Sequence, residues 1–109
     1  MIGIELFTAG AAARICVEKR YWWSADVSLK TEEWQKYASV IAPYLSDTDW
    51  NALVIAFMAV DNLRTIGDPR STDAITDAIA DKIAPILRDI EKGKDAIRPY
   101  HLDLPPARS

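Results

Sequence analysis

The sequence predicts an all-α, four-helix bundle-like domain, and three observations carry this prediction. Apolar residues recur at the helical period in four stretches that Pro, Gly and capping residues separate. Sustained alternation of polar and apolar residues is absent, as are the Asn-Gly and Asp-Gly dipeptides of tight hairpins. Glycine is scarce, with 4 in 109 residues. At this length we expect a single domain with a modest core.

The composition excludes some classes of function. Half of the residues are hydrophobic and 27% are charged, which is typical of a soluble globular protein. The formal charge of -3 and the pI near 5.0 argue against a nucleic-acid partner, which requires a basic surface. The single Cys16 allows no internal disulfide, so we expect a reducing, cytoplasmic location.

The first helix is expected to run from about Ile4 to Trp22. Ile4, Ala11 and Ile15 fall with Trp22 on one face at the helical period, and we expect this face to be buried. Trp23 lies roughly 100° away from that face at helical geometry. The tryptophan pair therefore separates into a core residue, Trp22, and a flanking residue, Trp23.

The same stretch, IGIELFTAGAAARICV, is mostly apolar and raises the question of a membrane span. A span needs roughly 20 apolar residues, and Glu5 and Arg14 interrupt this one. We therefore expect a helix of a soluble domain, with association of the protein with a membrane as an open alternative.

Capping residues define the second and third helices. Thr31 is the expected N-cap of the second helix, which should end near Ala42 because Pro43 follows. Ser46 is the expected N-cap of the third helix, and Gly67 its C-cap. The run ALVIAFMAV in the third helix is apolar on every side, which places this helix at the centre of the bundle.

The fourth helix is expected to begin at Ser71 or Thr72 and to end just before Gly93. Its apolar residues lie within an arc of about 120° at the helical period; they are Ile75, Ile79, Ile83, Ile86, Leu87 and Ile90. We therefore divide the chain into a helical bundle domain, residues 1–93, and a Pro-containing C-terminal tail, residues 94–109.

The aromatic residues supply the candidate interaction site. Aromatic side chains at helical spacing usually pack in the core, and we expect this for Trp22, Trp34 and Trp50. Trp23 either packs beneath the loop that follows it or faces a partner. With the neighbouring Tyr21 it forms the candidate interaction site, because exposed aromatic residues often anchor protein interfaces.

A candidate buried polar group lies on the third helix. Asp61 falls near Trp50 and Phe57 in the middle of an apolar face. A buried carboxylate needs a charged or hydrogen-bonding partner, and Arg64 or Arg14 could supply it. Alternatively, the helix reaches the surface at this point and Asp61 is solvated.

Residues that could carry catalysis are not grouped in the sequence. His101 is alone in the tail, and Cys16 has no base near it in sequence. Asp73, Asp77 and Asp81 recur on the fourth helix but read as a solvated acidic face. We therefore expect no catalytic residue, no metal and no cofactor, and an enzyme is disfavoured.

Residues 20–63 resemble a family of uncharacterised small helical proteins of actinobacteria. The resemblance rests on the Trp22-Trp23 pair, the Thr-x-x-Trp helix start that ends in Trp34, and the capped helix that begins with Trp50. The family implies a helical architecture and no activity. Because its members often carry a membrane helix upstream, the resemblance also implies a membrane-proximal location as one possibility.

These observations lead to the expectation of a non-enzymatic interaction or scaffolding module that self-associates as a homo-oligomer, most simply a homodimer. The third helix is apolar on every side, and four short helices need not cover it fully. One alternative is a small-molecule-binding or metal-dependent bundle that uses the aromatic cluster and Asp61. Another is the soluble part of a membrane-anchored protein.

Overall fold

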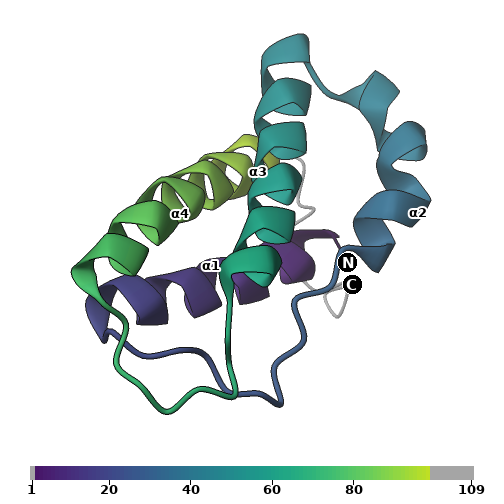
Figure 1. Cartoon of the computed structure of the whole chain (residues 1–109). Helices are drawn as coiled ribbons and strands as arrows, with labels where there is room; N and C mark the ends of the chain where they lie inside the picture. Colours follow the sequence, from purple (N-terminus) through teal and green to yellow (C-terminus); the bar gives the residue numbers. More distant parts are fainter. Residues whose placement is uncertain (1, 99–109) are drawn as a thin grey trace.

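The computed structural model describes residues 2–98, and it confirms the all-α prediction (Figure 1). The described residues contain no strand. The elements in chain order are α1 (Ile2–Glu18), α2 (Glu32–Ile41), the short 3-10 helix η1 (Ala42–Tyr44), α3 (Asp47–Ile66) and α4 (Asp77–Ile97).

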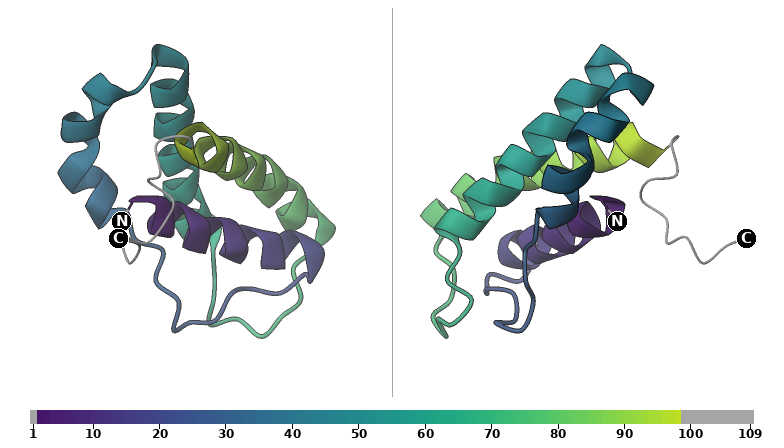
Figure 2. Two further views of the ribbon diagram at one scale, coloured as in Figure 1. Left: turned by 180° about the vertical axis from the view of Figure 1, so that it is seen from behind. Right: turned by 90° about the vertical axis from the view of Figure 1, so that its right-hand side faces the viewer.

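α1, α3 and α4 form the core, and α2 lies beside them. α4 packs along both α1 and α3, and α3 lies between α4 and α2 (Figures 1 and 2). α2 makes few contacts with the rest of the described chain. The radius of gyration, 14.1 Å, exceeds the roughly 13 Å of a compact domain of this length, which agrees with this uneven arrangement.

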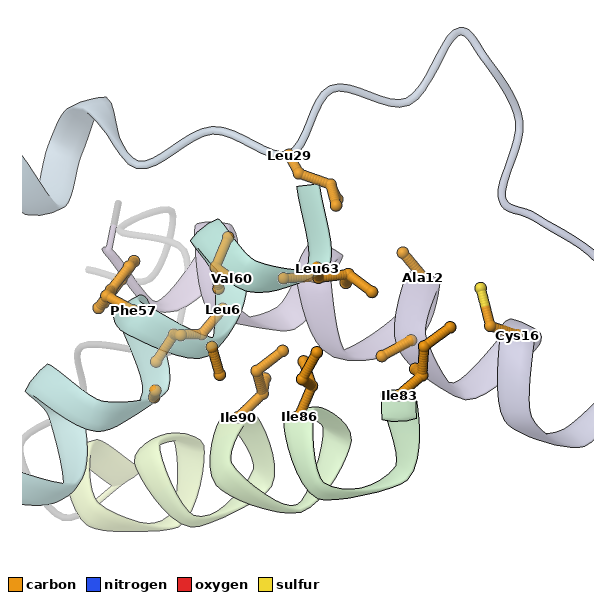
Figure 3. Packing of buried hydrophobic residues seen from close by; sticks show 14 of the residues in the cluster. Leu6, Ala12, Cys16, Leu29, Phe57, Val60, Leu63, Ile83, Ile86 and Ile90 are labelled. Carbon is orange, nitrogen blue, oxygen red and sulfur yellow. The ribbon is translucent and has the colours of Figure 1, made fainter. Parts of the chain in front are cut away.

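The core lies where α1, α3 and α4 face one another (Figure 3). Its α4 side is the isoleucine stripe predicted from the sequence, with Ile83 and Ile90 fully buried. α1 contributes mainly small side chains, which allow its neighbours to approach closely. The core residues of α1 are Leu6, Ala9, Ala12, Ala13 and Cys16; those of α3 are Leu53, Ala56, Phe57, Ala59, Val60 and Leu63.

Gly93 is a packing residue rather than the end of α4. A Cβ atom at this position would lie 2.3 Å from the Cβ of Ala56, so the missing side chain allows α3 and α4 to meet. The helix continues to Ile97, which is fully buried. The predicted helix end at Gly93 is therefore wrong, and α4 continues into residues that the prediction assigned to the tail. The rest of the predicted tail, residues 99–109, lies outside the described residues.

The start of α4 also differs from the prediction. The helix begins at Asp77, where the Oγ1 atom of Thr76 accepts a hydrogen bond from the backbone N–H of Ile79 at 3.3 Å. Ile75 is buried as predicted, but from the preceding loop, where its N–H donates to the carbonyl of Arg20 at 2.8 Å. The backbone N–H of Ile75 therefore bonds to another loop and not within a helix, although the predicted helix began at Ser71 or Thr72.

The caps of α3 agree with the sequence analysis. The Oγ atom of Ser46 accepts a hydrogen bond from the backbone N–H of Asp49 at 3.1 Å. Gly67 follows the last turn, and its N–H donates to the carbonyl of Leu63 at 2.8 Å. Both ends of α3 are thus determined locally, and this explains why they could be predicted.

The variant Gly93→Ala is expected to lower the free energy of unfolding by about 1 to 3 kcal/mol, because the added methyl group overpacks the contact with Ala56. Urea titration measures this change. The matched control is Gly10→Ala in α1, where an added Cβ would meet its nearest neighbour, Ile90, at an ordinary 3.4 Å. We expect this control to be neutral or stabilising by up to about 1 kcal/mol. Equal losses at the two positions would contradict the packing role of Gly93.

Candidate interaction surfaces

α1 carries apolar residues on two opposite faces, and only one of them is buried. Ile4 and Phe7 are 45% and 63% exposed, Ala11 is exposed and Ile15 is half-buried. The prediction that Ile4, Ala11 and Ile15 face the core is therefore wrong. The opposite face packs inward because its small side chains admit α4 closely, as the near contact of Gly10 with Ile90 illustrates.

A groove of about 300 Å³ runs beside this outer stripe of α1. It lies between α1 and the loop that follows the Trp pair, and no charged side chain among the described residues lines it. Its walls are Phe7, Thr8, Ala11, Ala12, Ile15, Trp23, Ser24 and Val27. We call this feature the α1 groove.

Trp23 is the more deeply buried member of the Trp pair, so of the two alternatives for Trp23 the packed one is observed, whereas Trp22 is not the core residue that was predicted. Trp23 is 5% exposed and packs against Gly67, where a Cβ atom would come within 2.2 Å of the indole ring. Trp22 is only partly buried and contacts the Trp23 ring edge-on, with centroids 5.7 Å apart. The prediction extended a helix to residue 22, but α1 ends at Glu18 and Arg20 takes a left-handed conformation with φ of 62°.

The candidate interaction site formed by Trp23 and Tyr21 is therefore not a joint surface. Tyr21 is 56% exposed, whereas Trp23 belongs to the core. Trp23 reaches the surface only as a wall of the α1 groove.

A carboxylate of α1 caps α2 across the fold. Glu5 is buried, and its two oxygens accept hydrogen bonds from the backbone N–H groups of Glu33 and Trp34, each at 3.0 Å. The predicted cap, Thr31, does not act in this way, because its Oγ1 atom accepts from the side chain of Gln35 at 2.9 Å. A carboxylate at a helix N-terminus satisfies free N–H groups and interacts favourably with the helix dipole.

One aromatic contact completes the attachment of α2. The ring of Trp34 stacks on Phe57 of α3, with centroids 4.6 Å apart and planes within 5°. The ring of Trp34 also lies next to that of Trp50, with centroids 5.3 Å apart. The sequence predicts Trp34 and Trp50 to be core residues. In the structure both are only partly buried. None of the ten residues described for α2 is buried.

α2, η1 and α3 as far as Met58 form what we call the α2–α3 arm, and five of its large apolar side chains are exposed. Three of them follow α2 and η1 at spacings of three and four residues, which places them along one side. Two more lie on α3. These five residues, the arm surface, are Tyr37, Val40, Tyr44, Ile55 and Met58.

The three residues proposed as buried polar groups are all on the surface. Asp61 forms an ion pair with Arg64 at 2.9 Å, and Arg64 also donates to the carbonyl of Leu29 at 3.1 Å. Arg14 pairs instead with Glu91 at 2.7 Å. Of the two alternatives for Asp61, the solvated one is observed, because the buried side of α3 centres on its Ala56 face and leaves Asp61 to solvent. Exposed pairs of this kind contribute little to stability.

The buried carboxylate that the sequence analysis missed is Glu5. The sequence does mark Glu5, because it is an acidic residue in a mostly apolar stretch. In the prediction it served only as an argument against a membrane span. Its partners are N–H groups 28 and 29 residues away, so no local pattern marks them.

Cys16 is the free thiol of the chain, and it is buried. Burial raises the pKa of the Cys16 thiol to about 11, so the sulfur is protonated at neutral pH. Within residues 2–98 no three His, Cys, Asp or Glu side chains are grouped so as to hold a metal ion. In the same part of the chain, no helix is long and apolar enough to cross a membrane.

Comparisons of the chain with models of protein families, with curated proteins and with solved structures found no match. Function therefore has to be inferred from the surfaces described above.

The variant Glu5→Ala is expected to loosen α2 while it leaves the three-helix core in place. Because the N–H groups of Glu33 and Trp34 would lose their acceptor, we expect α2 amides to exchange about 5- to 30-fold faster, as the loss of an N-cap implies. Hydrogen exchange resolved by residue measures this.

The matched control is Glu18→Ala, which removes an exposed glutamate from the other end of the same helix. It should leave exchange in α2 unchanged. Faster exchange throughout α3 and α4 in Glu5→Ala would show a global loss of stability instead and would contradict the capping role.

Proposed function

We propose that the protein is a non-enzymatic interaction module that self-associates through its α2–α3 arm. The observation that carries this proposal is that α2, whose residues are all described, buries none of them, although it is rich in apolar and aromatic side chains. An apolar helix face on a folded domain usually packs against another element.

The weak attachment of α2 supports a partner at this position. An isolated helix of ten residues is marginal in water, and α2 is held by the cap from Glu5, the stack of Trp34 on Phe57 and the partial burial of Ile41 against the core. A second copy placed on the arm surface would supply the missing apolar layer. Two arms related by a two-fold axis form four helices, which is a common way to complete a bundle.

The chemistry of the arm surface also fits a protein interface. Tyr37 and Tyr44 each combine a large apolar ring with a polar tip, and Met58 adapts easily to an opposing surface. We place this function in the cytoplasm, because the free thiol of Cys16 fits a reducing compartment.

The alternative of a ligand- or metal-binding bundle has less support. It required Asp61 inside the fold beside the aromatic cluster, whereas the Asp61 side chain is 59% exposed and paired with Arg64. The arm surface therefore provides the better-supported function.

Sedimentation equilibrium of the full chain tests the proposal. We expect a reversible dimer whose dissociation constant rises more than tenfold, about 1.4 kcal/mol, in Met58→Glu, because a charge would be buried in the apolar interface. Val40→Glu, on the other helix of the arm, should act in the same direction.

The matched control is Ala78→Glu, an exposed alanine in the first turn of α4, at the far side of the molecule from α2 (Figure 1). It should leave the dimer unchanged. A wild-type chain that remains monomeric at millimolar concentration, or a dimer that both arm variants leave intact, would contradict the proposal.

A further inference from the structure

We propose that the α1 groove is the docking site of the C-terminal segment of the same chain, residues 99–109. The groove is a different surface from the arm, so this inference does not depend on self-association. It rests on where the described chain ends, on the length of the remaining segment and on the pattern of its residues.

The described chain ends close to the groove. α4 runs antiparallel to α1, since Asp77 at its start pairs with Arg20 and Lys94 near its end lies over the ring of Phe7, with Nζ 5.1 Å from the centroid. Phe7 is itself a wall of the groove. The last turn of α4 is held in place by Ile97, which is fully buried. The chain therefore leaves α4 near Phe7, one wall of the groove, and has to pass around α1 to enter the groove, which lies on the outer side of this helix.

The remaining segment is long enough to follow the groove. Its eleven residues span up to roughly 36 Å when extended. The walls contributed by α1, from Phe7 to Ile15, cover about 12 Å along the helix axis. About half of the segment is thus enough to cross the groove, and the first residues can make the turn out of α4.

The sequence of the segment matches the chemistry of the groove. Tyr100, Leu102 and Leu104 alternate with polar residues, so all three project to the same side of an extended chain. Prolines at positions 99, 105 and 106 favour extended backbone and reduce the entropy lost on docking. An apolar strip of this kind suits walls made of Ala, Ile, Trp, Phe and Val side chains.

Tethering favours this occupant over any free ligand. A segment joined to the domain by a short connection has an effective concentration in the millimolar range. Weak apolar contacts are then sufficient for docking, and His101 and Asp103, which alternate with the apolar residues, can remain in water.

Disulfide trapping in the full chain tests the proposal. The double variant Ser24→Cys and Leu104→Cys places one thiol on the groove wall and one on the side of the segment that would face the groove, and Cys16 is buried and protonated. The experiment uses the Met58→Glu background at low micromolar concentration, so that self-association does not contribute. We expect an intramolecular disulfide, detected by mass and by gel mobility without reductant.

The control pair is Asn62→Cys and Leu104→Cys, which offers an exposed position on α3 instead of the groove. Docking predicts a disulfide in the Ser24 pair about tenfold faster than in the control pair, as a raised local concentration requires. Tyr100→Glu with Leu102→Glu should remove this difference. Equal rates in the two pairs would overturn the proposal, as would a disulfide that joins two chains, which would assign the groove to the segment of another copy.

Discussion

The packing of α4 against both α1 and α3 is the interaction on which the rest of the structure depends. α4 presents one narrow isoleucine stripe, and the glycine at position 93 brings this stripe against α3 without an intervening side chain. A stripe of this width covers one face of each neighbour. α1 and α3, however, are apolar on more than one face. Three helices therefore form a core and still leave apolar surface in water, and both proposed interactions follow from this imbalance.

α2 does not correct the imbalance, because its residues are at most partly buried against the core. A carboxylate from α1 holds its first turn, and one indole ring stacks on α3. Such contacts fix the position of a helix but contribute less than a buried apolar face. The molecule thus combines a well-packed three-helix core with an arm whose stability is open to influence from a partner.

The elements that the sequence predicted correctly are those that local chemistry determines. The isoleucine stripe of α4 and the capping of α3 by Ser46 need no knowledge of the neighbours. The errors arose where a residue serves tertiary contacts. Gly93 was predicted to end the fourth helix, but it allows α4 to pack closely on α3. Glu5 interrupts an apolar stretch of the sequence, but it caps α2. Trp22 does not extend the buried face of the first helix, because the left-handed turn at Arg20 follows the early end of that helix.

Hydrogen exchange of the unmodified chain over a range of protein concentrations tests the central claim most directly. If the arm is an unfinished face that a second copy completes, amides of α2 and of the first half of α3 exchange through local openings in dilute solution. Their protection should then rise with concentration, while α1, α4 and the rest of α3 stay protected throughout. Protection of α2 that equals that of α4 in the dilute monomer, or that does not depend on concentration, would contradict the account.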